Sequence, residues 1–115
     1  MKVVIRFGEK FIRQAKQLKK KYPSLAADLK ELEKLLLETP DAEVDLGGGL
    51  RKVRISIASK GKGKSGGARV ITYTTIISIE AELITLLTIY DKSERSSISD
   101  KELRILVAEL SEKKE

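Results

Sequence analysis

The 115-residue sequence predicts an α+β fold, in which helices and strands occupy separate parts of the chain. Three observations indicate this. Apolar residues recur at helical spacing over residues 9–38 and again after residue 99, whereas alternation typical of a strand begins at Leu50. A nearly continuous apolar run from Leu83 to Tyr90 is expected of a central strand that is covered on both faces. The predicted order is β-α-α-β-β-β-α, in one domain large enough to bury a core.

The first part of the chain predicts a strand followed by a helical hairpin. Lys2 to Phe7 forms the strand, which we expect to pair with an edge of the sheet. A helix is predicted from Glu9 to Tyr22 and ends before Pro23, and a second one extends to about Glu38 and ends at Thr39-Pro40. Two amphipathic helices joined this tightly form a hairpin. The second helix carries a leucine stripe that we assign to the core: Leu25, Leu29, Leu32, Leu35 and Leu36.

The second half predicts an antiparallel three-stranded meander. Asp41 to Gly49 is expected to be a linker. Strands are predicted over Leu50–Ala58 and Ala68–Thr75, with a Gly/Lys/Ser loop over Ser59–Gly67 between them. A turn at Ser78–Ala81 leads into the central apolar strand. Consecutive strands with such short connections pair as neighbours.

A last helix is predicted to begin after Ser99. Ser99 and Glu102 match the capping box S-x-x-E, in which each side chain accepts a hydrogen bond from the other residue's backbone. The polar end from Glu112 to Glu115 is expected to fray. The apolar stripe of this helix is Leu103, Leu106, Val107 and Leu110.

The whole net charge of +6 lies in one segment. Between Leu46 and Ile79 the sequence has seven basic residues and no acidic one, while the rest has 16 basic and 17 acidic residues. Lys52 and Arg54 alternate with the apolar Val53 and Ile55, which predicts a strand with one basic and one apolar face. Such a concentration of like charge favours a polyanionic partner, most often nucleic acid. The seven residues are Arg51, Lys52, Arg54, Lys60, Lys62, Lys64 and Arg69.

Several classes of site are excluded by composition. The chain has no cysteine and no histidine, so it can form neither disulfides, thiolate metal sites nor Ser-His or Cys-His catalytic pairs. We expect no metal and no cofactor. Gly63-Lys64-Ser65 is not a P-loop, because that motif would need glycine where Ala58 stands and a helix after the serine. Without a long apolar run or a signal-peptide pattern, we expect a cytoplasmic protein that binds no membrane.

The loop over Ser59–Gly67 has the composition of a phosphate-binding segment. Its glycines let the backbone approach a ligand closely, and its lysines offer mobile charges. The alternative is a disordered hairpin loop whose lysines are merely solvated. Tyr73 and Tyr90 could stack on a base, although their strand positions favour a core role. The loop lysines are Lys60, Lys62 and Lys64.

Two segments carry a resemblance to a known family. KGKGKSGGARVITY (Lys60–Tyr73) and LLTIYDKSERSSIS (Leu86–Ser99), together with the hairpin and the last helix, resemble the RelE/ParE superfamily of type II toxin–antitoxin toxins, closest to its HigB-like branch. The resemblance implies one RelE-like toxin domain over residues 1–115. Members on the RelE-like side are small ribonucleases, many of which cleave messenger RNA in the ribosomal decoding site. It therefore implies an mRNA interferase that needs no cofactor and whose partners are mRNA, the ribosome and a cognate antitoxin protein.

The resemblance also implies the site residues. Many RelE-type members have a functional tyrosine after the final basic cluster, but Ile98 stands there in this chain, so the proton-transfer group stays open. The lysine loop and Arg95 would contact RNA or the ribosome. RNA can be cleaved by its own 2′-OH, which needs only orientation, a proton acceptor and stabilisation of charge. Lysine crowded by cations can act as a base, and arginine can hold a phosphate. The implied catalytic residues are Lys52, Arg54, Arg69 and Lys92.

Two other functions stay open at this point. One is a ParE-like inhibitor of a protein target such as gyrase, although that branch generally lacks the full basic set. The other is a non-catalytic RNA-binding module. Cleavage of translated mRNA would distinguish the mRNA interferase from both of these alternatives.

Overall fold

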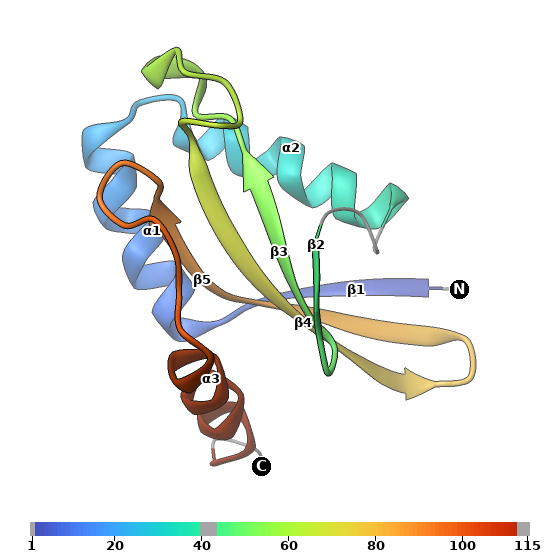
Figure 1. The fold of residues 1–115 in the computed structure, drawn as a ribbon. Coiled ribbons are helices and arrows are strands. Elements are labelled where there is room, and N and C mark those ends of the chain that lie inside the picture. Colours follow the sequence, from blue (N-terminus) through green and yellow to red (C-terminus); the bar gives the residue numbers. More distant parts are fainter. Residues whose placement is uncertain (1, 40–43, 113–115) are drawn as a thin grey trace.

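The structure, a computed structural model, describes residues 2–39 and 44–112. In this part of the chain, three α-helices pack on a five-stranded sheet in the order β1-β5-β4-β3-β2 (Figure 1). β1 runs parallel to β5 and the other neighbours are antiparallel. The elements are β1 (Lys2–Phe7), α1 (Glu9–Lys21), α2 (Leu25–Glu38), β2 (Val44–Gly47), β3 (Leu50–Ile55), the 3₁₀ turn η1 (Ala58–Lys60), β4 (Ala68–Ser78), β5 (Ala81–Asp91) and α3 (Asp100–Glu112).

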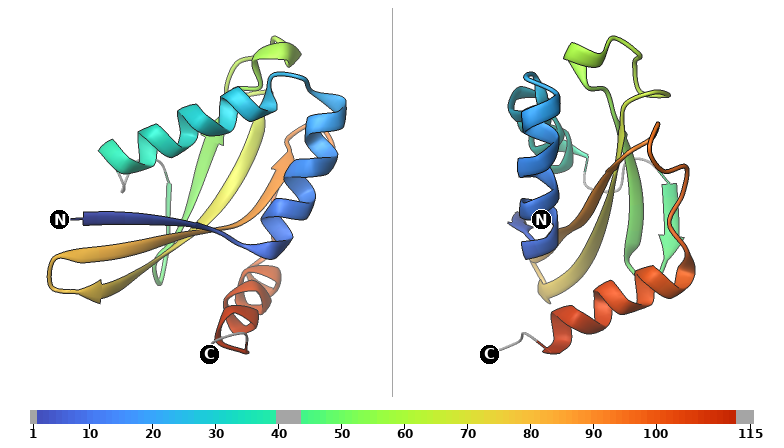
Figure 2. Two further views of the ribbon diagram at one scale, coloured as in Figure 1. Left: turned by 180° about the vertical axis from the view of Figure 1, so that it is seen from behind. Right: turned by 90° about the vertical axis from the view of Figure 1, so that its left-hand side faces the viewer.

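The two faces of the sheet are covered differently. α1 and α2 lie over one face, while α3 and the segment that leads to it lie over the other (Figure 2). Phe11, Leu25 and Leu36 of the helical hairpin belong to one apolar cluster with buried residues of β3, β4 and β5. Leu103 and Leu106 of α3 belong to a second, smaller cluster on the opposite face. The α+β class predicted from the sequence is confirmed.

The predicted helices form where the apolar stripes place them. Leu25, Leu32 and Leu36 are buried on α2, and Leu29 and Leu35 pack against them, as expected for core residues. The capping box before α3 is present, because the Glu102 amide donates to Ser99 Oγ at 3.2 Å and the Ser99 amide donates to Glu102 Oε1 at 3.4 Å. The predicted fraying beyond Glu112 and the predicted stop at Pro40 fall on residues outside the described ranges. None of the described helices has the length and apolar character needed to cross a membrane.

The expected linker over Asp41–Gly49 contains a strand, which corrects that prediction. β2 pairs with the neighbouring β3, and Gly47, Gly48 and Gly49 connect the two with positive φ angles of 89°, 61° and 89°. Left-handed backbone of this kind favours glycine, so the glycine run is a tight turn. β2 has only four residues, all exposed, so the alternation of Val44 and Leu46 with Asp45 is too short to predict a strand. Residues 41–43 of the expected linker lie outside the described residues.

The strand boundaries near the basic segment also differ from the prediction. β3 ends at Ile55, and Ala58–Lys60 turns away as η1 instead of continuing the strand. β4 runs three residues further than predicted, to Ser78, before the expected turn into β5. The predicted two faces of β3 are confirmed, since Val53 and Ile55 are buried while Arg54 is exposed. β5 lies between β1 and β4, as expected for the apolar central strand.

Candidate functional site

A row of three side chains crosses the sheet on the face that carries α3. Arg54 of β3 is the register partner of Arg69 of β4, and Arg69 is the partner of Tyr90 of β5. Directly opposed residues of antiparallel strands project from the same face. Lys52 lies two residues from Arg54 and therefore shares this face. We call Lys52, Arg54 and Arg69 the basic face; the structure brings these three predicted catalytic residues together.

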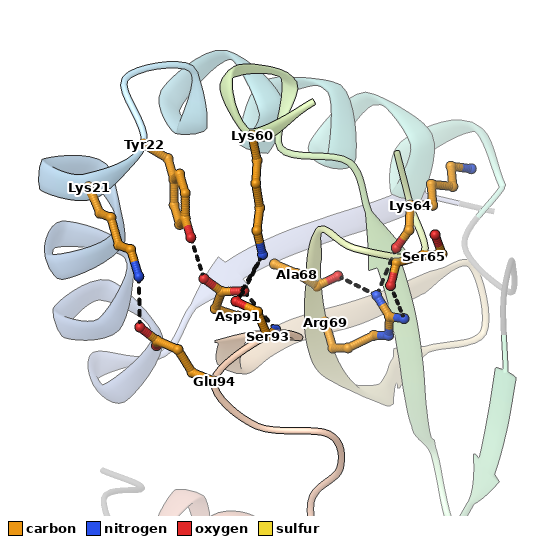
Figure 3. A network of polar contacts seen from close by, with 10 residues as sticks. All are labelled: Lys21, Tyr22, Lys60, Lys64, Ser65, Ala68, Arg69, Asp91, Ser93 and Glu94. Carbon is orange, nitrogen blue, oxygen red and sulfur yellow. Dashed lines mark hydrogen bonds and ion pairs between the residues drawn. The ribbon is translucent and has the colours of Figure 1, made fainter. Parts of the chain in front are cut away.

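Arg69 is buried and holds the neighbouring loop. Its side chain is 6% exposed, and its guanidinium donates to the carbonyl oxygens of Lys64 at 2.9 Å, Ala68 at 3.2 Å and Ser65 at 3.3 Å (Figure 3). These bonds compensate the cost of burying the charge. Arg69 therefore fixes the backbone of the lysine loop beside Arg54, a role that the sequence analysis did not anticipate.

The three loop lysines occupy different environments. Lys60 is nearly enclosed, and its ammonium lies 2.5 Å from a carboxylate oxygen of Asp91 and 3.1 Å from Ser93 Oγ (Figure 3). It also lies over the ring of Tyr22, 5.6 Å from the ring centroid. Lys62 and Lys64 are exposed. The position of Lys60 favours a role as the anchor of the loop, and leaves Lys62 and Lys64 as its solvent-facing charges.

Asp91 is the acceptor that joins these segments. It accepts hydrogen bonds from Tyr22 Oη at 2.6 Å, from Lys60, and from both the amide and the hydroxyl of Ser93 at 2.9 and 2.8 Å. Burial alone would raise the pKa of Asp91, but the hydrogen bonds from Lys60, Tyr22 and Ser93 outweigh it and hold that pKa well below its ordinary value. The sequence analysis missed Asp91; its place directly after the apolar run of β5 was the available signal.

The segment between β5 and α3 carries the remaining two predicted site residues. Lys92 donates to the carbonyl oxygen of Ser96 at 3.2 Å. The Arg95 guanidinium lies over the ring of Tyr90, 5.7 Å from its centroid, pairs with Glu102, and donates through Nε to the Ser97 carbonyl at 2.7 Å. Arg95 thus borders the row formed by Arg54, Arg69 and Tyr90.

The basic face lies apart from one cavity of the structure and borders another. A cavity of about 680 Å³ lies between the start of α1 and α3, but none of the predicted site residues lines it. Arg54 and Lys64 line a smaller one of about 290 Å³ with Asp28 and Glu31 of α2. Within the described residues, no cluster of three or more acidic side chains could hold a metal ion. A row of cations across neighbouring strands suits an extended polyanion better than a small molecule.

The buried ion pair yields a stability prediction. Asp91→Asn is expected to lower the free energy of unfolding by about 3–5 kcal/mol at pH 7, because it leaves the buried Lys60 ammonium without its partner. The pKa of Asp91 is depressed in the folded state, so its stabilisation is complete above the unfolded value near about 4 and is lost as the pH falls further. The difference in the free energy of unfolding between wild type and variant, measured by urea denaturation, should therefore shrink as the pH is lowered from about 5 to about 3.

Asp45→Asn is the matched control, since Asp45 forms an exposed ion pair with Arg51 at 3.8 Å. It should change the free energy of unfolding by about 0.5 kcal/mol or less. Equal losses for the two variants would contradict the role given to Asp91.

Comparison with known proteins places this arrangement in a family. The structure is similar to that of a double arginine-to-alanine variant of the E. coli toxin RelE in the free state, with a TM-score of 0.55 over 84% of this chain and 90% of that chain. At 15% sequence identity this similarity shows a shared fold. Residues 5–113 also match the family described as the RelE toxin of the RelE / RelB toxin-antitoxin system. Assignment to the HigB-like branch stays a prediction. Because the family match covers nearly the whole sequence, this chain belongs to the RelE family of toxins from toxin–antitoxin systems.

Proposed function

We propose that this protein is an mRNA interferase, an endoribonuclease that cleaves translated messenger RNA on the ribosome and acts in the cytoplasm. The observation that carries the proposal is the basic face, where Lys52, Arg54 and Arg69 lie side by side across β3 and β4. Membership of the RelE family supports a toxin, and the cationic surface supports an RNA substrate.

The chemistry that we propose uses the 2′-OH of the RNA as the nucleophile. This hydroxyl attacks the adjacent phosphate, the bond to the 5′ oxygen breaks, and a 2′,3′-cyclic phosphate and a 5′-hydroxyl result. The exposed Arg54 guanidinium would hold the phosphate through paired hydrogen bonds, and Lys52 would lie beside it on the same face. Such a site orients the attack and stabilises the developing negative charge, which are the main requirements of the reaction.

The remaining predicted residues would support this centre. Arg69 would hold the lysine loop against the basic face through the carbonyls that it binds. Lys62 and Lys64 would contact the RNA backbone without reading its sequence. Lys92 and Arg95 would contribute charge from the segment that leads to α3.

We further propose that a cognate antitoxin protein neutralises the toxin. Either it covers the basic face, or it prevents entry into the ribosome sterically. An acidic partner would associate quickly and with a salt-sensitive rate, because opposite charges steer the encounter.

Arg54→Gln is expected to lower the rate of mRNA cleavage by about 10²–10³, the usual cost of removing one preorganised donor from a charged transition state. Because Arg54 is exposed, its replacement should leave the fold intact. Cleavage is measured by primer extension on an mRNA translated in a reconstituted system, with toxicity on induction in cells as a second measurement.

Arg51→Gln is the matched control. Arg51 lies on the same strand as Arg54, three residues away. Because successive side chains of a strand alternate between the two faces, the side chain of Arg51 projects from the other face. Both variants lose one charge, and only the variant of Arg54 should lose activity. Equal cleavage by the two would place the active centre elsewhere, and absence of cleavage by a toxic wild type would favour a protein target instead.

The exposed loop lysines yield a prediction about salt dependence. Replacing Lys62 and Lys64 with glutamine should weaken binding to single-stranded RNA. It should also make the slope of the logarithm of the binding constant against the logarithm of the salt concentration less steep, by about 0.7 for each lysine that contacts a phosphate. Replacing Lys16 and Lys20, two exposed lysines of α1, removes the same charge from a different surface and should leave the slope unchanged. Equal slopes for both double variants would show that the loop is merely solvated.

A further inference from the structure

Tyr90 has a hydroxyl group that the fold does not use. The side chain is 8% exposed, and its hydroxyl is the one fully buried side-chain nitrogen or oxygen, among the described residues, that has no hydrogen-bond partner. Leaving such a group unpaired in the interior costs stability, so phenylalanine would pack here at a lower cost. A tyrosine in this position therefore points to a function for its hydroxyl.

The surroundings of this hydroxyl are cationic. Tyr90 is the register partner of Arg69, which is the partner of Arg54, so it ends the row that crosses the basic face. Burial raises the pKa of Tyr90, and the charge of Glu102 raises it further. The nearby charges of Arg69 and Arg95 lower this pKa by less, so it lies above its ordinary value. The phenol therefore stays protonated at neutral pH and can donate a hydrogen bond.

Arg95 lies against the ring of Tyr90 in the free protein. Its guanidinium lies over the Tyr90 ring and is held there by Glu102 and by the carbonyl of Ser97. The Arg95 side chain is 40% exposed, so a phosphate arriving from solvent can compete with Glu102 for it. A guanidinium that moves to a phosphate would leave the ring and bring that phosphate close to Tyr90.

We propose that the Tyr90 hydroxyl is a hydrogen-bond donor to a phosphate of the bound RNA, and that Arg95 lies against the Tyr90 ring until RNA binds. This inference rests on the proposed function, because it takes RNA as the ligand of the basic face. Tyr90 thereby joins Arg54 and Lys52 as a residue that touches the substrate, and it supplies a neutral donor where its neighbours supply charge. No bond is made or broken by Tyr90 in this role.

The three tyrosines of the chain provide a matched set of variants. Tyr90→Phe should weaken binding of a single-stranded RNA by about 10- to 100-fold, the range for losing one hydrogen bond to a charged group. Its melting temperature should equal or exceed that of wild type. Tyr73→Phe, on the neighbouring strand, should change neither. Tyr22→Phe should lower the melting temperature, because Tyr22 donates to Asp91.

The RNA carries 2′-deoxy sugars at every position that could be cleaved, so that affinity is measured without turnover. A toxin that binds this RNA but leaves unsubstituted, translated mRNA uncut would contradict the proposed function and still test Tyr90. Unchanged affinity of Tyr90→Phe beside a binding wild type would overturn this inference alone. So would a drop in melting temperature as large as that of Tyr22→Phe, since it would reveal a structural partner. A wild type that binds no RNA would overturn this inference, whereas the proposed function is tested separately by cleavage of translated mRNA.

Discussion

The carboxylate of Asp91 joins three segments that are far apart in the sequence. It binds Tyr22 after α1, Lys60 in the loop after β3, and Ser93 after β5, and all of these contacts are short (Figure 3). A buried ion pair is weak evidence for stability by itself, because desolvation offsets the attraction. Its effect here is positional: it fixes where the loop leaves the sheet, and Arg69 then fixes where the loop returns. The exposed Lys62 and Lys64 lie in the loop that these two sets of contacts hold.

This arrangement is consistent with the proposed cleavage of RNA by a chain without histidine. Antiparallel pairing aligns Arg54, Arg69 and Tyr90 in one row, and the apolar cluster around α3 covers the same face without covering Arg54. Arginine and lysine supply charge to orient and stabilise a phosphate, while the RNA supplies its own nucleophile. The cavity of about 680 Å³ is lined by other residues, whereas Arg54 and Lys64 line the smaller one beside α2.

Much of the fold could be predicted from the sequence, because the helices and long strands have strong apolar periodicity. The two faces of β3 and the central place of β5 follow from the same patterns. β2 could not be predicted in this way, since a short exposed edge strand is formed through pairing with β3 and not through burial. Secondary structure of that kind depends on tertiary context.

The site was only partly predictable for a related reason. The charge pattern indicated that Lys52 and Arg54 share a face, and the register of β3 with β4 places Arg69 on the same face. Composition could not distinguish Lys60 from Lys62 and Lys64, because the difference comes from Asp91, 31 residues further along the chain. The unpaired hydroxyl of Tyr90 was likewise invisible, since a tyrosine in an apolar strand ordinarily indicates core.

The chemistry of the RNA ends tests the central claim most directly. Messenger RNA recovered from a translation reaction with wild-type toxin would be analysed for the groups at its new termini. Attack by the 2′-OH predicts 2′,3′-cyclic phosphate and 5′-hydroxyl ends, and predicts that 2′-deoxy substitution at the cleaved position blocks the reaction. New ends that carry a 5′-phosphate, or intact mRNA from cells whose growth the toxin arrests, would contradict the account.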